Sequence, residues 1–121
     1  MNERSPLVKA FGFAGAGVLH MLRSQRNARI HLALTLLALT LGWWLRLSAP
    51  EWAILVLTIG FVWAAETMNT AIEGVVDLVS PERHPLAKIA KDAAAGAVLI
   101  AAITAVLVAA FLFLPRLLAF F

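Results

Sequence analysis

The strongest constraint on this chain is an uncharged apolar run from Ala93 to Leu114. A helix needs about 20 predominantly apolar residues to cross the roughly 30 Å hydrocarbon core of a bilayer, and this run is long enough. In a chain of 121 residues that is 62% hydrophobic and 14% charged, so much apolar surface cannot be buried inside a soluble fold. We therefore predict an all-α membrane protein with membrane helices at about 30–47, 52–79 and 93–114, forming a single domain over residues 1–121.

A helix of a different kind is expected at about residues 6–27. Its apolar residues fall on one helical face, and Lys9, Arg23 and Arg26 add positive charge. Such an amphipathic helix lies on the membrane surface, where anionic lipid attracts it. The residues of the apolar face are Leu7, Phe11, Ala14, Val18 and Leu22.

The positive residues are distributed unequally around the predicted membrane helices. Only Arg46 and Arg116 lie on the side of the first loop and the C-terminus, against eight Lys and Arg on the other side. Cytoplasmic segments carry this excess, so we predict a cytoplasmic N-terminus, a cytoplasmic second loop and an external C-terminus. Pro115 is expected to end the last helix. The eight residues are Arg4, Lys9, Arg23, Arg26, Arg29, Arg83, Lys88 and Lys91.

Net charge and cysteine content exclude several other functions. A net charge of +3 with a pI of about 10.2 would suggest nucleic-acid binding in a soluble protein, but here the positive residues mark the membrane side, and we expect no nucleic-acid partner. The chain has no cysteine, which excludes disulfides, Cys-based zinc sites and thiol catalysis. His20 and His31 lack metal-ligand spacing and are expected to be interfacial fillers.

The second apolar stretch carries a stripe of polar residues. Glu66, Asn69, Glu73 and Asp77 fall at i, i+3, i+7 and i+11, within roughly 80° of arc on one helical face. Measured from Trp52, Glu66 lies about 21 Å along the helix and Glu73 about 31 Å, near the cytoplasmic edge of a roughly 30 Å core. A carboxylate at the bilayer centre costs at least about 2.5 kcal/mol and somewhat less near the edge, which favours a functional role.

The cytoplasmic loop at 80–92 adds groups that suit phosphate. Lys91 and Asp92 are expected beside the first amides of the last helix, whose dipole favours anions. Mg²⁺ takes one or two carboxylates together with substrate phosphates, and Glu66 could remove a proton from a hydroxyl group at the membrane surface. These parts favour a membrane-surface phosphotransferase. Two alternatives remain open: a proton or ion path through a small bundle, and polar contacts that hold helices together.

Two motifs resemble those of the bacterial membrane diacylglycerol kinase/undecaprenol kinase family, and the second is most similar to its undecaprenol kinase branch. The resemblance extends over almost the whole chain, including Gly15-x-Gly17 and Arg26-Asn27-x-Arg29-Ile30-His31. The two motifs are Glu66-x-x-Asn69-Thr70-Ala71-Ile72-Glu73-x-x-Val76-Asp77 and His84-Pro85-Leu86-Ala87-Lys88-x-Ala90-Lys91-Asp92-x-Ala94-Ala95-Gly96-Ala97-Val98.

The resemblance implies a small homotrimeric protein of the bacterial inner (plasma) membrane. Each chain would have a surface helix and three transmembrane helices, and active sites would form between subunits at the cytoplasmic interface. The family uses MgATP to phosphorylate a lipid alcohol, so ATP and Mg²⁺ are the expected cofactors and membrane lipids the surroundings. The expected alcohol is undecaprenol, giving undecaprenyl phosphate; the alternative is diacylglycerol, giving phosphatidic acid. An alternative of another class is a non-catalytic or ion-conducting helical bundle.

The resemblance also implies roles for individual residues. Glu66 would be the catalytic base, Glu73 a metal ligand, and Asn69 a residue that positions substrate or phosphate. Lys91 and Asp92 would contact the ATP phosphates and neighbouring groups. The remaining assignments are Glu82, Arg83 and His84 near the nucleotide, Phe13 beside the nucleotide, and Ala95 along the lipid path.

One position departs from the family pattern. Before Arg-Asn the family usually has a second metal-binding glutamate, whereas this chain has Gln25. A glutamine offers a carbonyl oxygen to Mg²⁺ but no charge. We therefore expect weaker metal binding there, or compensation by a water molecule or another carboxylate such as Asp77.

Overall fold

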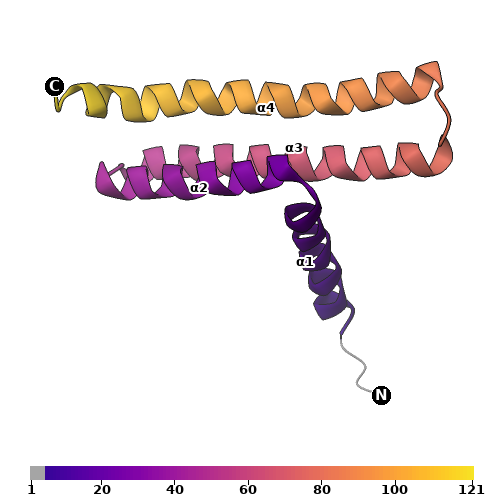
Figure 1. Cartoon of the computed structure of the whole chain (residues 1–121). Coiled ribbons are helices and arrows are strands. Elements are labelled where there is room, and N and C mark those ends of the chain that lie inside the picture. The colour runs from indigo at the N-terminus through magenta and orange to yellow at the C-terminus, as the bar shows by residue number, and fades with distance from the viewer. Residues whose placement is uncertain (1–4) are drawn as a thin grey trace.

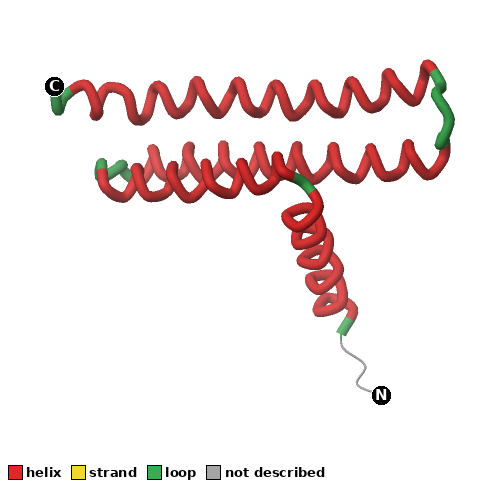
Figure 2. The backbone as a smooth tube through the Cα atoms, viewed as in Figure 1, coloured by secondary structure: helices red, strands yellow, loops and turns green. Residues whose placement is uncertain are grey.

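The structure is a computed structural model that describes residues 5–121, and this part of the chain is entirely helical apart from its short connections (Figures 1 and 2). The predicted all-α fold is confirmed. Arg4, one of the residues used to predict topology, lies outside the described residues. The helices are α1 (Pro6–Ser24), α2 (Arg26–Trp44), α3 (Ala49–Val79) and α4 (Pro85–Leu118).

The two longest helices, α3 and α4, form an antiparallel hairpin, and α2 lies beside the first part of α3 (Figure 1). The helix α1 leaves this bundle at a steep angle from the start of α2. The last part of α3, the 80–84 loop and the first part of α4 therefore extend beyond α2; we call this region the charged end. At the opposite end, the turn at 45–48 lies beside the C-terminus; we call it the aromatic end.

Local capping explains where the helices begin. Ser48 caps α3 in a reciprocal capping box: its hydroxyl accepts from the Glu51 amide at 3.4 Å, and the Glu51 carboxylate accepts from the Ser48 amide at 3.0 Å. Pro50 in the first turn lacks only an amide hydrogen that the helix would not use. At α4, His84 Nδ1 accepts from the Leu86 amide at 3.1 Å. Both ends of the α3–α4 hairpin are thus anchored by short-range bonds.

The aromatic end holds the main cluster of buried apolar side chains, contributed by α2, α3, α4 and the 45–48 turn. Trp44 and Phe120 stack with ring centroids 5.4 Å apart, which ties the C-terminus to α2. Arg116 donates two hydrogen bonds to the Glu51 carboxylate, at 2.5 and 2.6 Å, and so joins α4 to α3. The buried residues of the cluster are Leu45, Leu47, Leu55, Leu112 and Phe113.

Along the rest of the hairpin, large apolar side chains face outward. Leu57 on α3 is 75% exposed and Val106 on α4 is 68% exposed. Both helices are long and apolar enough to cross a membrane, which supports the prediction of a membrane protein. The shorter helix α2 is not apolar enough to meet the same test, so the count of three membrane helices stays a prediction.

Some predicted helix boundaries are wrong. The last helix begins at Pro85 rather than at residue 93, because Pro85 starts a helix that the charged residues of the loop continue. It also runs through Pro115 to Leu118 instead of stopping there. A proline this close to a helix end removes few backbone hydrogen bonds. In the same turn, the side chain of Arg116 donates to the Leu112 carbonyl at 3.2 Å. The break after α1 falls at Gln25, whose extended backbone separates α1 from α2.

Candidate functional site

The most unusual side chain in the structure is the carboxylate of Glu66 on α3. Glu66 is 2% exposed, and among the described residues its buried oxygen Oε2 has no hydrogen-bond partner. The nearest ionisable group is His31 on α2, with Nε2 at 3.4 Å from Oε2. A buried carboxylate is costly unless it is satisfied, so this oxygen needs an explanation. The sequence placed His31 as an interfacial filler; the structure instead turns its ring toward Glu66.

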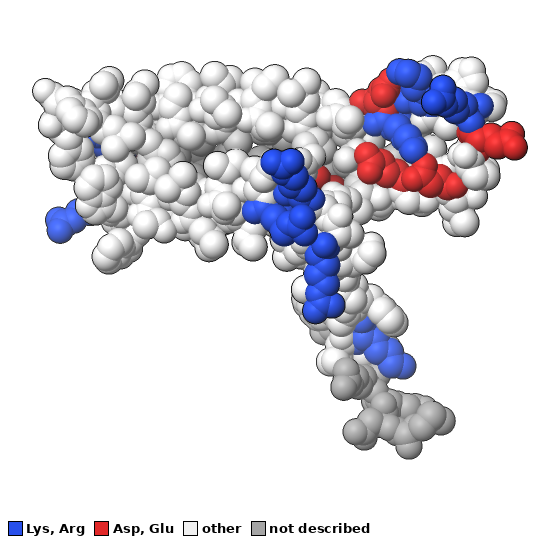
Figure 3. All heavy atoms as spheres, in the orientation of Figure 1, with Lys and Arg blue, Asp and Glu red and all other residues white. Residues whose placement is uncertain are grey.

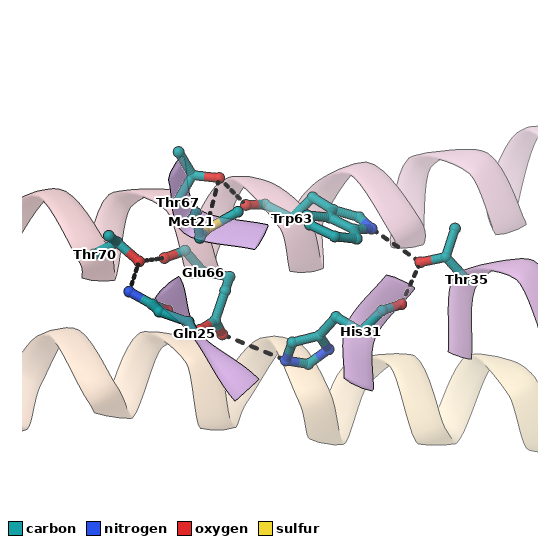
Figure 4. A network of polar contacts seen from close by, with 8 residues as sticks. All are labelled: Met21, Gln25, His31, Thr35, Trp63, Glu66, Thr67 and Thr70. Atoms are coloured by element: carbon teal, nitrogen blue, oxygen red, sulfur yellow. Dashed lines mark hydrogen bonds and ion pairs between the residues drawn. The ribbon is translucent and has the colours of Figure 1, made fainter. Parts of the chain in front are cut away.

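Three helices meet around Glu66 (Figure 4). Gln25, between α1 and α2, donates from Nε2 to the Thr70 hydroxyl at 2.8 Å, and Thr70 donates to the Glu66 carbonyl at 3.0 Å. Met21 of α1 is buried, with its sulfur 3.8 Å from the Thr67 hydroxyl. These contacts fix the α1–α2 junction against α3 at the level of Thr70. The predicted metal-ligating position Gln25 is therefore engaged, through its amide nitrogen, with α3.

The rest of the predicted stripe continues from Glu66 toward the charged end. Asn69 is half-buried and its Oδ1 is also buried without a partner among the described residues. Glu73 is half-buried, and Asp77 is exposed and forms an ion pair with Lys91 of α4. Spacing along the helix predicted the stripe; the cross-helix pair between Asp77 and Lys91 depends on the packing of α3 on α4.

The prediction that Lys91 and Asp92 lie beside the first amides of the last helix is wrong. Because α4 begins at Pro85, Lys91 and Asp92 lie in its second turn rather than beside its first free amides. Asp92 is exposed and pairs with Lys88 one turn earlier at 2.5 Å. His84, expected near the nucleotide, uses Nδ1 to cap the helix. Lysines and carboxylates nevertheless gather at this end of the molecule, as Figure 3 shows.

Four of the predicted site residues are exposed in the single chain. Glu82 and Arg83 lie in the exposed 80–84 loop. Phe13 is 76% exposed on α1, which projects away from the hairpin (Figure 1). Ala95 is exposed on α4. Within one chain, the structure therefore places Gln25, His31 and Lys91 beside α3, whereas Phe13 stays exposed.

A magnesium ion would find carboxylates here but not a complete cage. No group of three or more His, Cys, Asp or Glu able to hold a metal lies within residues 5–121. Glu73 and Asp77 are one helical turn apart on α3, and the amide of Gln25 is held beside Thr70, about one turn before Glu73. This donor set suits Mg²⁺, which usually takes one or two carboxylates and completes its shell with phosphate oxygens and water.

An apolar cavity lies close to the stripe, between α1 and α3. Its volume is about 450 Å³. It opens beside Thr67, which directly follows Glu66 in the chain, so an apolar chain lying in it would be close to the Glu66 level. The cavity is lined by Val18, Trp63, Ala64, Thr67, Met68 and Ala71.

Together, these groups can support a transfer reaction at an interface between apolar and aqueous surroundings. A buried carboxylate with an unpaired oxygen can accept a proton, carboxylates and a lysine can bind a metal–phosphate group, and an apolar cavity can hold a lipid chain. The signals for Glu66, Asn69 and Glu73 were present in the sequence. No local signal predicted the contact of His31, because the two residues are far apart in the chain.

Comparison with known proteins identifies similar chains. Residues 12–113 match the family model of prokaryotic diacylglycerol kinase. The chain is 43% identical over 116 residues to the undecaprenol kinase of Bacillus subtilis, covering 96% of this chain and 94% of that protein. It is 50% identical over 113 residues to a diacylglycerol kinase of Synechocystis, covering 93% of this chain but 65% of that protein. It is 35% identical over 101 residues to the diacylglycerol kinase of Escherichia coli, covering 84% and 83%.

Proposed function

This chain belongs to the prokaryotic diacylglycerol kinase family and is a lipid kinase, and on that premise we propose that it transfers the γ-phosphoryl group of MgATP to undecaprenol. The observation that carries the chemistry is the buried Glu66 carboxylate with an oxygen that no described residue satisfies. What favours undecaprenol is the similarity to the Bacillus subtilis undecaprenol kinase over nearly the whole of both chains. The Synechocystis relative is more identical and favours diacylglycerol as the alternative acceptor.

We propose that the cytoplasmic membrane surface lies at the level of Gln25, where α1 leaves the bundle. From there the 19 residues of α2 extend about 28 Å, and α3 from Ala49 to Thr70 extends about 32 Å. Both lengths match a hydrocarbon core of roughly 30 Å, so α2 joins α3 and α4 as a third span. Glu66 then lies one turn inside the surface and Glu73 one turn outside it.

The same placement gives an orientation in the bacterial plasma membrane. The N-terminus and the 80–84 loop are cytoplasmic, and the aromatic end with the C-terminus is external. The exposed Arg23, Arg26 and Arg29 then lie near the surface level, where anionic headgroups attract them. At the other end, the pocket formed by Trp43, Trp44, Arg46 and Trp52 falls at the height of an interfacial aromatic belt.

In the proposed reaction, the lipid hydroxyl lies at Glu66 with its chain in the neighbouring apolar cavity. Glu66 accepts the hydroxyl proton as the oxygen attacks the γ-phosphorus, and the bond to the bridging oxygen of ADP breaks. Asn69, with its unpaired Oδ1, orients the substrate, and Lys91 neutralises phosphate charge. Mg²⁺, held by Glu73 with Gln25 or Asp77, would neutralise charge on the phosphate oxygens.

We further propose that the site is completed between subunits of a homotrimer. Phe13, Glu82 and Arg83 are exposed in the single chain, and the outward apolar faces of α3 and α4 are available for neighbouring subunits as well as lipid. In this arrangement Phe13, Glu82, Arg83, His84 and Asp92 surround the nucleotide. Ala95 lies along the lipid path.

A competition assay tests the acceptor. Purified protein in mixed lipid is given labelled ATP with equal amounts of undecaprenol and diacylglycerol. We expect undecaprenyl phosphate as the main product, and none when Mg²⁺ is chelated. Phosphatidic acid as the main product would reassign the acceptor to diacylglycerol, and no phosphorylated lipid of either kind would favour a non-catalytic or ion-conducting bundle.

A further inference from the structure

The proposed reaction leaves one half-buried ionisable side chain without a role. His31 on α2 faces the carboxylate of Glu66, with Nε2 3.4 Å from Oε2, and the two side chains are 17% and 3% exposed. We infer that His31 is a positioning residue that holds Glu66 in the orientation needed to accept the proton of the lipid hydroxyl. This inference rests on the proposed function, in which Glu66 is the base.

The distance between His31 Nε2 and Glu66 Oε2 is slightly longer than that of a hydrogen bond. Good N–H···O bonds measure about 2.7–3.2 Å, and Glu66 Oε2 has no hydrogen-bond partner among residues 5–121. Catalytic hydrogen bonds are often long before substrate binds and shorten in the reacting complex. The His31 ring is the only ionisable group of the described residues within ion-pairing distance of this oxygen, so it is the group that can complete the bond.

The position of His31 is fixed from both sides along α2 (Figure 4). Before it, Gln25 bonds to Thr70 of α3 at 2.8 Å. One turn after it, the Thr35 hydroxyl accepts from the Trp63 indole at 2.9 Å and donates to the His31 carbonyl at 2.7 Å. Two side-chain hydrogen bonds to α3 therefore bracket the His31 ring, one made by Gln25 just before α2 and one made by Thr35 within α2. A shift of α2 along α3 would break at least one of them.

Because His31 faces Oε2, the inference also assigns the two oxygens of Glu66. His31 donates from Nε2 to Oε2 and leaves Oε1 for the lipid hydroxyl. The hydroxyl proton passes to Oε1, the hydroxyl oxygen bonds to the γ-phosphorus, the bond to ADP breaks, and His31 keeps its own proton. Neighbouring charged side chains do not compete with His31 for the Glu66 carboxylate. Arg29 on α2 donates to the Arg23 carbonyl at 3.2 Å, and α4 has no charged residue between Ala93 and Leu114.

The test compares three variants in the same lipid-kinase assay. His31→Leu removes the donor, His31→Gln keeps a donor on a similar reach, and His20→Leu makes the same change at an exposed histidine of α1. We expect His31→Leu to lower kcat about 10- to 100-fold with KM for ATP and for lipid unchanged, because a displaced base slows chemistry rather than binding. His31→Gln should recover part of kcat, and His20→Leu should match wild type.

A double variant separates this inference from the proposed function. In a Glu66→Gln background, whose residual kcat should be about 10²- to 10⁴-fold below wild type, adding His31→Leu should cause no further loss, because both changes act on one group. A His31→Leu enzyme with wild-type kcat beside a Glu66→Gln enzyme with this reduced kcat overturns the role of His31 alone. A Glu66→Gln enzyme with wild-type kcat overturns the assignment of the base, and with it this inference.

A further variant keeps the test decisive if His31→Leu does not fold. Thr35→Val keeps a side chain of similar shape and removes only the hydroxyl that bonds to Trp63 and to the His31 carbonyl. We expect kcat to fall about threefold with both KM values unchanged, since the bracket loosens while His31 remains. An unchanged kcat in that enzyme overturns the inference.

Discussion

Two glutamates of α3, Glu51 at the aromatic end and Glu66 nearer the charged end, differ in how their carboxylates are satisfied. At the aromatic end, Glu51 caps its own helix through Ser48 and accepts two hydrogen bonds from Arg116. Toward the charged end, Glu66 is more deeply buried, yet its oxygen Oε2 has no hydrogen bond and only His31 nearby. Glu66 is therefore the more costly of the two carboxylates to bury, yet it has fewer hydrogen bonds than Glu51.

This difference separates a structural carboxylate from a candidate catalytic one. Bonds that saturate Glu51 hold α3 to α4 and leave little capacity for another ligand. An unsatisfied buried group reduces stability, and such a group usually persists where function needs it. The apolar cluster of the aromatic end supplies rigidity, while the polar groups at the other end remain available to bind ligands.

The largest expected effect comes from making the same substitution in both glutamates. Glu66→Gln should lower kcat by about 10²- to 10⁴-fold, because the amide cannot accept the hydroxyl proton. Glu51→Gln should change turnover of the folded enzyme by less than about twofold while lowering its thermal unfolding midpoint, because Arg116 loses its charged partner. Steady-state kinetics and thermal unfolding in detergent measure the two quantities.

Equal loss of turnover in both variants would show that the two ends are not functionally distinct. Normal turnover in Glu66→Gln would remove Glu66 from the chemistry.

A second pair of variants tests the rigidity of the aromatic end. A Cβ atom on Gly42 would lie 2.9 Å from Cη2 of Trp52 and 3.1 Å from Cδ1 of Leu47, whereas one on Gly60 of α3 would meet nothing within 4 Å. Gly42→Ala should therefore destabilise the protein by about 1–3 kcal/mol through overpacking. Gly60→Ala should stabilise it by up to about 1 kcal/mol, because alanine favours the helix.

Denaturant unfolding in detergent compares these two variants with wild type. If Gly42→Ala is as stable as Gly60→Ala, Trp52 moves freely and this end is not tightly packed.

The smallest expected effect concerns the metal side of the charged end. Gln25→Glu should lower the Mg²⁺ concentration for half-maximal activity about threefold, since a carboxylate adds charge beside Glu73. Part of the gain is offset because the glutamate can no longer donate to Thr70. Titration of activity with Mg²⁺ measures this, with Asn27→Asp as a control that adds the same charge at an exposed position of α2. A higher Mg²⁺ requirement in Gln25→Glu would place residue 25 away from the metal.

Much of the fold was predictable from local pattern. The apolar runs predicted the all-helical character and three membrane helices, of which α3 and α4 are apolar and long enough to span, and 3.6-residue spacing predicted that Glu66, Asn69 and Glu73 share a face. Boundaries at proline were less predictable, because Pro85 starts a helix and Pro115 lies within one. A proline's effect depends on how many hydrogen bonds its position would need.

The sequence alone determined that this chain is helical, that it is too apolar for a soluble domain, and that one helix carries acidic residues on a single face, because these properties depend on neighbours within a few residues. Only the tertiary structure decided which of its glutamates is saturated. Arg116 lies 65 positions from Glu51, and His31 lies on a different helix from Glu66. Contacts between distant positions arise from how helices pack, and no local pattern records which side chains that packing brings within hydrogen-bond distance.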